Sequence, residues 1–283
     1  MLDTPQMEAA MAEVPALLVI GAHPDDCEIT AGGFAALTAA RGGRVLHVAL
    51  TNGDKGHQTL GGATLARIRR DEARAAAAAL GAESIVLDNH DGELMPTLEH
   101  RFEVIRIIRD FKPDVVLFPR PYDYHPDHRY TAQLAQDALY MVRVQNVCPF
   151  NDRLEDDPVA MYVSDPFEKP YPFQPDVIID IGSVYERKLE AIGCHASQMY
   201  EWLPFVDWGV PLSDVPSDPT GRLAFLREHW EARFRRDADR FRSQLISSYG
   251  AERGRKIAYA EAFEVCELGT ELTPEARQRL FPV

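Results

Sequence analysis

Two short motifs combine imidazole and carboxylate side chains at a spacing that suits a metal site. The first, His23–Asp26 (HPDD), supplies one imidazole and two carboxylates, and the second, His125–His128 (HPDH), supplies two imidazoles and one carboxylate. Catalytic zinc usually takes three nitrogen or oxygen ligands from the protein and keeps one position for water. We therefore predict a metal site whose ligands are His23, Asp26 and His128.

The neighbouring carboxylate of Asp25 is available for a different task from that of Asp26. Adjacent side chains of an extended turn point in different directions, so one aspartate can bind the metal while the other faces the water. Zinc lowers the pKa of bound water to about 7, and a nearby carboxylate can then accept its proton. Such a set could activate water for attack on a substrate.

Both motifs also have a plainer structural interpretation. Aspartate and histidine that follow a strand commonly cap a helix or accept hydrogen bonds from a turn. Either motif alone is explained at least as well in that way. The occurrence of both at matching strand ends favours the metal site.

The elements that must position these motifs follow an alternating pattern. Apolar runs predict strands, and the stretches between them predict helices, in the order 16–21, 29–41, 44–50, 65–80, 84–87, 98–111 and 114–118. This alternation predicts an α/β fold, with a Rossmann-like, mostly parallel sheet flanked by helices. Ligands of such sheets bind beyond the carboxyl ends of the strands, where both motifs would lie.

The second half of the chain predicts a C-terminal elaboration of this core. Residues 149–176 are rich in Pro, Asp and aromatic residues and predict a long excursion. Further predicted elements are a strand at 177–181, a helix at 183–199, a loop at 200–219, a long helix at 222–249 and a strand at 258–268. We predict one domain over residues 1–283, with a core at about 16–268 and the elaboration at about 149–250.

The amino-acid composition indicates which binding partners and which cellular compartment to expect. The chain has 30 Lys and Arg against 44 Asp and Glu, a net charge of −14, which argues against a nucleic-acid partner. The four cysteines are scattered, as in a reduced cytoplasmic protein. The N-terminal sequence lacks a secretory signal, and its apolar run is too short to span a membrane. We expect a cytoplasmic protein with no membrane partner.

Seven short motifs occur in order along nearly the whole chain. They are Ala22–Glu28 (AHPDDCE), Thr51–Gly56 (TNGDKG), Arg69–Glu72 (RRDE), Asp91-Gly92, His125–His128 (HPDH), His195–Gln198 (HASQ) and Tyr259–Phe263 (YAEAF). In content and order they resemble the LmbE/PIG-L family of zinc-dependent de-N-acetylases. That family includes N-acetylglucosaminyl-phosphatidylinositol deacetylases, mycothiol- and bacillithiol-pathway deacetylases, and chitobiose deacetylases.

The resemblance implies an LmbE-like fold, one Zn²⁺ per chain, and the three ligands that the two motifs already predict, which are His23, Asp26 and His128. It implies that Asp25 is the general base. His125 would lie beside the scissile carbonyl and stabilise the oxyanion or protonate the leaving amine. Asp127 would orient the ring of His125 and so select its tautomer. Members of the family often form trimers or hexamers, so the resemblance implies that this chain could form a homo-oligomer of that kind.

Three further residues are candidates for contact with substrate. Arg69 and Asp91 match family positions near the sugar, and Tyr124 directly precedes HPDH. Each has a structural alternative. Arg69 could form an ion pair with Glu72 on the same helix, Asp91 could belong to an Asp-Gly turn, and Tyr124 could simply pack within its loop. His195 is predicted to cap the end of a helix.

The expected substrate is a small N-acetylated sugar or sugar conjugate. The absence of an amphipathic anchor favours a soluble N-acetylglucosamine-type compound over a membrane glycolipid. One alternative is a zinc amidase that cleaves a thiol-sugar conjugate or another N-acyl substrate. A nucleotide-binding protein is disfavoured, because the turn after the first strand is HPDD rather than a glycine-rich phosphate loop. A sugar-binding protein without catalysis is a further alternative.

Overall fold

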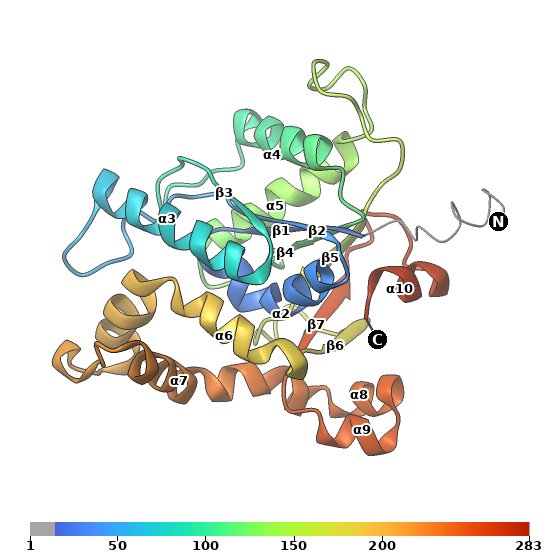
Figure 1. Ribbon diagram of the computed structural model, residues 1–283. Coiled ribbons are helices and arrows are strands. Elements are labelled where there is room, and N and C mark those ends of the chain that lie inside the picture. Colours follow the sequence, from blue (N-terminus) through green and yellow to red (C-terminus); the bar gives the residue numbers. More distant parts are fainter. Residues whose placement is uncertain (1–14, 283) are drawn as a thin grey trace, which may run out of the picture.

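The computed structural model describes residues 15–282. The prediction that the N-terminal sequence lacks a secretory signal concerns residues outside this range. The described residues form one sheet whose strands are β1 (Ala16–Gly21), β2 (Arg44–Ala49), β3 (Glu83–Val86), β4 (Val115–Phe118), β5 (Val159–Val163), β6 (Val177–Asp180) and β7 (Ala260–Val265). Their spatial order is β3-β2-β1-β4-β5-β7-β6 (Figure 1).

The sheet is parallel except at β7. β1 pairs in parallel with β2 and β4, while β7 is antiparallel to both β5 and β6. The chain builds outward from β1 in one direction through β2 and β3, and then returns to place β4 on the other side of β1. This reversal leaves a crevice at the carboxyl ends of β1 and β4.

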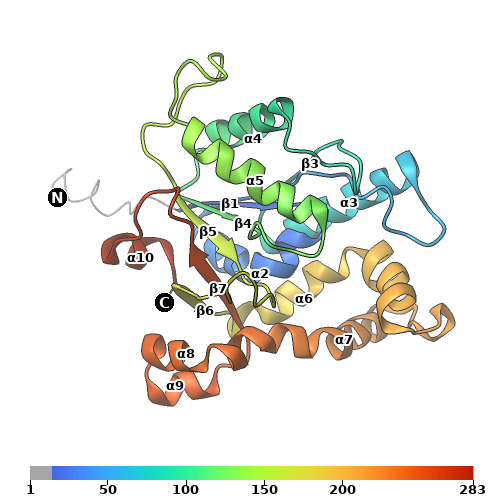
Figure 2. The same ribbon diagram turned by 180° about the vertical axis from the view of Figure 1, so that it is seen from behind.

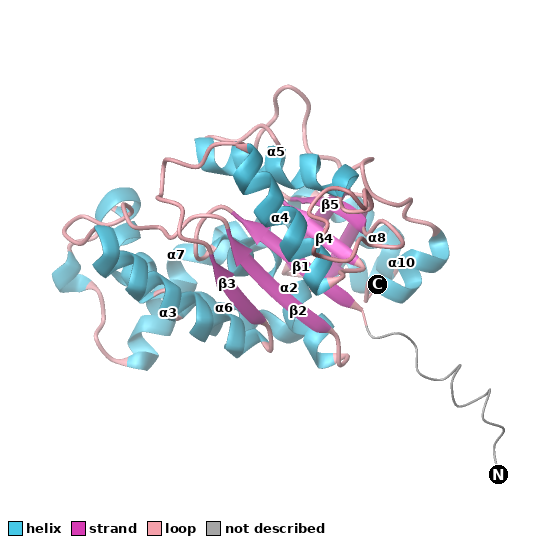
Figure 3. Cartoon of the chain, turned by 90° about the horizontal axis from the view of Figure 1, so that it is seen from above, coloured by secondary structure: helices cyan, strands magenta, loops and turns pink. Residues whose placement is uncertain are grey.

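Helices cover both faces of the sheet. They are α2 (Asp26–Ala40), α3 (Gly62–Leu80), α4 (Leu98–Phe111), α5 (Pro126–Met141), α6 (Tyr185–Gly193), α7 (Pro219–Arg240), α8 (Arg242–Tyr249), α9 (Ala251–Lys256) and α10 (Pro274–Leu280). α4 and α5 lie on one face, and α2, α6 and α7 lie on the other (Figures 1 and 2). The view from above shows α4 and α5 over the strands (Figure 3). The predicted α/β fold with a mostly parallel sheet is confirmed.

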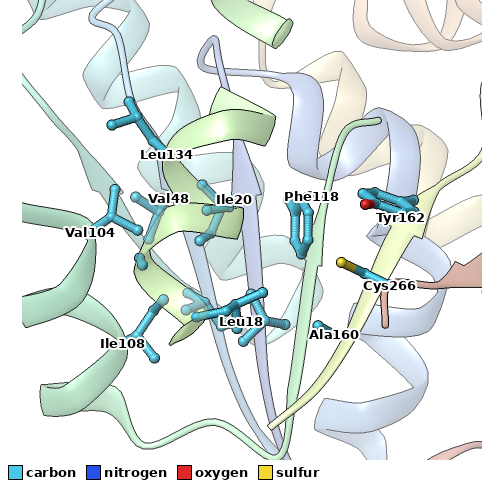
Figure 4. Packing of buried hydrophobic residues seen from close by; sticks show 14 of the residues in the cluster. Leu18, Ile20, Val48, Val104, Ile108, Phe118, Leu134, Ala160, Tyr162 and Cys266 are labelled. Carbon is cyan, nitrogen blue, oxygen red and sulfur yellow. The ribbon is translucent and has the colours of Figure 1, made fainter. Parts of the chain in front are cut away.

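Each face of β1 has its own apolar cluster. Leu18 and Ile20 pack beneath α4 and α5 (Figure 4). Leu17 and Val19 point the other way, into a cluster that includes Phe34 of α2. Since full burial of one such side chain contributes about 1.5–3 kcal/mol, the two clusters hold β1 firmly in the middle of the sheet. The loop that follows β1 is therefore anchored on a rigid base.

The structure differs from the predicted elements mainly in the second half. β5 lies inside the predicted excursion, because its five residues are too short to stand out among the surrounding prolines and aspartates. The predicted helix at 222–249 is broken at Phe241, which has φ −110° and ψ 34°, into α7 and α8. The predicted loop at 200–219 contains helical turns at Gln198–Trp202 and Pro204–Trp208.

No helix in residues 15–282 combines the length and the apolar composition that a membrane crossing requires. The single domain over the whole chain and the cytoplasmic location stay predictions.

Candidate active site

Both motifs lie at the carboxyl ends of the central strands, at the start of a helix. HPDD joins β1 to α2, and HPDH begins α5 after the loop that follows β4. The amino-terminal ends of α2 and α5 therefore meet at one place. Backbone N–H groups at a helix start carry partial positive charge, which suits a site built from carboxylates.

The three predicted metal ligands converge. Nδ1 of His23 lies 3.2 Å from Nε2 of His128, and Oδ2 of Asp26 lies 3.7 Å and 3.4 Å from these two nitrogens. Ligand bonds of about 2.0–2.2 Å in a tetrahedral zinc site place ligand atoms roughly 3.3–3.6 Å apart. Two imidazole nitrogens and one carboxylate oxygen at these separations fit a single zinc ion.

The backbone of the HPDD turn holds Asp26 in place. Its Oδ2 accepts hydrogen bonds from the backbone N–H groups of Ala22 at 2.9 Å and His23 at 2.8 Å. Burial alone would raise the pKa of Asp26, but the neighbouring His128 and His23 lower it far below its usual range. Gly21 allows this close approach, because a Cβ there would lie 2.6 Å from the Cβ of Asp26.

Asp123 orients the ring of His128, and the motif analysis did not find it. Its Oδ1 lies 2.9 Å from Nδ1 of His128 and also accepts from the backbone N–H of His125 at 3.0 Å. A carboxylate on the far nitrogen of a ligating histidine keeps the proton there and leaves the other nitrogen's lone pair for the metal. An acidic residue five positions before a predicted ligand was the available signal.

Two carboxylates lie near the far ring nitrogen of His23. Its Nε2 lies 3.2 Å from Oδ1 of Asp91 and 3.4 Å from Oδ2 of Asp127. Burial opposes protonation of His23, yet its contacts with Asp127, Asp26 and Asp91 raise the pKa of its ring. Asp91, predicted to contact substrate, thus lies against a predicted metal ligand, although it also lines the cavity.

Asp127 is placed differently from the expectation that its side chain orients His125. The carboxylate is fully buried and accepts from the backbone N–H groups of Gly92 at 2.7 Å and Leu94 at 3.3 Å. Its backbone N–H, rather than its carboxylate, donates to Nδ1 of His125 at 3.2 Å. The neutral His125 ring then carries its proton on Nε2, and burial together with His23 and His128 lowers its pKa.

Two other groups of donor atoms overlap the predicted set. His23, His125 and His128 form one, and His23, Asp91, His125 and Asp127 form the other, with the donor atoms of each group within 4.8 Å of one another. Both oxygens of Asp127 already accept backbone hydrogen bonds, whereas in Asp26 only Oδ2 does, and the donor atoms of the predicted set lie at ligand-like separations of 3.2–3.7 Å. The set His23, Asp26 and His128 stays the predicted cation site.

Asp25 is held in a strained conformation by Arg69. Its backbone φ is 155°, a value that L-residues rarely adopt and that costs on the order of 1–3 kcal/mol. Nη2 of Arg69 donates to Oδ2 of Asp25 at 3.0 Å and to the carbonyl oxygen of Pro24 at 2.9 Å. Burial raises the pKa of Asp25, and Arg69 opposes this rise. Arg69, predicted to contact substrate, is only 2% exposed, and its hydrogen bonds position Asp25.

These residues form the base of a cavity of about 750 Å³. Tyr124, the third predicted substrate contact, lines it and is 72% exposed, with its ring centroid 5.3 Å from that of His128. Other walls come from the C-terminal elaboration, including Trp202 and Trp230. This volume lies within the usual range for small-molecule pockets, about 300–1,000 Å³.

The HASQ motif supports the site from beneath. His195 is fully buried, and its Nε2 lies 3.2 Å from Oε2 of Glu28, whose other oxygen lies 2.7 Å from Nδ1 of His47. The two histidines overcome the effect of burial and lower the pKa of Glu28 to about 2. The expected role of His195 as a helix cap is replaced by this buried pairing with α2.

The segment of the chain that is similar to known proteins includes both HPDD and HPDH. Residues 18–139 match the family model PIG-L, described as GlcNAc-PI de-N-acetylase. Diacetylchitobiose deacetylase of Thermococcus kodakarensis is 33% identical over 205 residues, which cover 69% of this chain and 76% of that relative. The chain belongs to the PIG-L family. All nine predicted site residues lie within the segment that matches the PIG-L model.

Two further similarities define the range of PIG-L-like proteins that this chain resembles. A 4-oxalmesaconate hydratase of Pseudomonas putida is 32% identical over 212 residues, covering 71% of this chain and 78% of the relative. The structure of N,N'-diacetylchitobiose deacetylase from Pyrococcus horikoshii, complexed with its inhibitor MPG, superposes with a TM-score of 0.67 at 26% identity, covering 95% of each chain. Relatives at similar identity thus include a deacetylase and a hydratase.

The ligand set predicts a measurable metal content. Purified protein loaded with zinc should hold about one ion per chain after desalting, because three converging protein ligands bind zinc tightly. His128→Ala should lose most of this zinc when measured by inductively coupled plasma mass spectrometry. His100→Ala, which removes a histidine at the start of α4, is the control and should keep it. Equal zinc in both variants would contradict the ligand set.

The contact between Asp123 and His128 predicts a subtler effect. Asp123→Asn leaves all three ligands in place but removes the charge behind His128, so zinc affinity should fall by about 10- to 100-fold. Competition with a fluorescent chelator measures this affinity. Asp110→Asn, on the exposed side of α4, should behave like the unaltered protein. An unchanged zinc affinity in Asp123→Asn would rule out this orienting role.

Proposed function

We propose that this protein is a zinc-dependent hydrolase that removes the N-acetyl group from an N-acetylglucosamine-type sugar or sugar conjugate. The observation that carries the proposal is the convergence of His23, Asp26 and His128 beside Asp25 and His125 at the base of one cavity. Membership of the PIG-L family and the similarity to two diacetylchitobiose deacetylases support it.

The chain's own residues divide the work of amide hydrolysis. When bound, zinc acidifies water and polarises a carbonyl group. Oδ2 of Asp25 is held by Arg69, so Oδ1 is the oxygen that accepts the proton of the attacking water. Nε2–H of His125 donates a hydrogen bond to the developing oxyanion. The proton that Asp25 accepts from water then passes from its carboxyl group to the leaving amine, which restores the carboxylate. Although Asp25 stands at the N-cap position of α2, its carboxylate makes no hydrogen bond to the helix start, which leaves Oδ1 for the attacking water.

The second candidate is hydration of a carbon–carbon double bond. The similarity to 4-oxalmesaconate hydratase favours it, since its identity to this chain is within one percentage point of that of the deacetylase. Water activation by a metal and a carboxylate serves both reactions, so the polar residues alone do not separate them. The alternative of a zinc amidase for thiol-sugar conjugates is not favoured by these relatives.

The deciding assay measures the product. Zinc-loaded protein incubated with N-acetylglucosamine or N,N'-diacetylchitobiose should release acetate and a free amine in equal amounts. Treatment with a chelator should abolish the release, and added zinc should restore it. Hydration of 4-oxalmesaconate without any release of acetate from N-acetylated sugars would replace the proposal with the second candidate.

Removal of the proposed base should abolish turnover without removing the metal. Asp25→Asn should lower kcat by about 10²- to 10⁴-fold, because general base catalysis contributes a factor of this size. Zinc content is measured alongside kcat. Asp71→Asn, which alters an exposed aspartate on α3, is the matched control and should keep its activity. Full turnover by zinc-bound Asp25→Asn would remove Asp25 from the mechanism.

Arg69 should act through Asp25. Arg69→Gln should lower kcat by about 10²-fold with little change in KM, since it misplaces the base rather than the sugar. Arg69 lowers the pKa of Asp25, so its loss should raise that pKa and move the acidic limb of the kcat/KM profile to higher pH.

Arg70→Gln, which alters the half-exposed neighbour of Arg69, is the control and should leave the profile in place. A raised KM for Arg69→Gln with an unshifted pH profile would instead indicate direct contact between Arg69 and the sugar.

A further inference from the structure

Two arginines of α7 line the same cavity as the proposed catalytic residues. Arg233 and Arg236 are three residues apart, so they lie on one face of the helix. α7 comes from the C-terminal elaboration and lies outside the segment that matches the family model (Figures 1 and 2). Neither residue has a part in the proposed hydrolysis.

Arg233 is a cation without a close counter-ion. In residues 15–282, no carboxylate oxygen lies within 4.0 Å of its guanidinium nitrogens. The guanidinium carbon lies 4.8 Å from the centroid of the Trp230 ring, which supports it from one side. Its side chain keeps exposed surface although it lines the cavity, so it is open to a molecule that enters.

Arg236 adds a second positive charge to the same wall. Its Nε lies 3.2 Å from Oδ1 of Asp237, an oxygen that also accepts from Ser164. Two neighbouring cations on one helix face repel each other, and in a chain of net charge −14 their placement needs a local reason.

We propose that Arg233 and Arg236 bind an anionic group, a carboxylate or a phosphate, on the substrate whose amide lies at the metal site. This inference rests on the proposed deacetylase function and narrows its substrate to an acidic N-acetylated sugar. A guanidinium offers a planar fork of N–H donors that matches both carboxylate and phosphate oxygens. The anion supplies the counter-charge that the described residues do not place beside Arg233.

The test compares sugars that differ in charge. N-acetylglucosamine, N-acetylglucosamine 6-phosphate and N-acetylmuramic acid present no anion, a phosphate and a carboxylate. At least one anionic sugar should have a kcat/KM about 10- to 100-fold above that of the neutral sugar, the factor expected for one charge-assisted hydrogen bond. Which of the two is preferred identifies the anion. Equal values for all three sugars would overturn the inference.

Variants separate anion binding from a general electrostatic role. Arg233→Gln should remove most of the preference for the anionic sugar, through a raised KM, and Arg233→Lys should recover part of it. Arg235→Gln is the matched control, because Arg235 lies on the same helix but pairs with Glu231 at 3.7 Å outside the cavity. A fall in kcat of the same size for neutral and anionic sugars would show that Arg233 serves only to balance Asp25 and Asp26, and would overturn the inference.

A binding measurement keeps this inference distinguishable from the proposed function. Glucosamine 6-phosphate and glucosamine are titrated into the zinc-loaded protein by calorimetry, with and without Arg233→Gln. Tighter binding of the phosphate that is lost in Arg233→Gln, in a protein that cleaves no N-acetyl sugar, would support the anion site while refuting deacetylation. Acetate release with no difference between the two ligands would refute the anion site alone.

Discussion

The close approach of three electron-rich atoms at the carboxyl ends of β1 and β4 is the constraint on which this site depends. Two imidazole nitrogens and a carboxylate oxygen lie 3.2–3.7 Å apart, although they come from two segments of the chain that are remote in sequence. The rigid central strand fixes one segment and the start of α5 fixes the other. Displacement of either strand end would separate the donors beyond the reach of one cation.

The remaining polar residues are arranged to direct these donors. Each predicted imidazole ligand has a carboxylate within 3.4 Å of its other nitrogen, Asp123 for His128 and Asp91 with Asp127 for His23. So many acids in one crevice repel each other, and the arginine at Asp25, the helix starts and the backbone N–H groups around Asp127 offset that repulsion. Oδ2 of Asp26 accepts backbone hydrogen bonds beside the histidine ligands, whereas Oδ2 of Asp25 accepts from Arg69. The two neighbouring aspartates can therefore take separate tasks.

The sequence was sufficient for the core and for the identity of the converging residues, because both depend on local patterns. Apolar runs marked β1 to β4, and the two tetrapeptides marked the donors. The contacts of Arg69, Asp91 and Asp127 were beyond sequence reasoning, since each partner lies on another strand or loop and residue type alone does not indicate direction. Asp123 was missed because its position before HPDH has the appearance of an ordinary turn, and β5 because a short buried strand has no period of its own.

The origin of α7 has a consequence for how this enzyme could acquire new substrates. The residues proposed to perform the reaction lie within 18–139, whereas a wall of their cavity is supplied by a helix at Pro219–Arg240. The residues proposed to perform the reaction and one wall of their cavity are thus encoded in separate stretches of the gene. Drift in the distal stretch could retune what enters the cavity while the hydrolytic apparatus stays intact, which makes α7 the natural target for redesign of specificity.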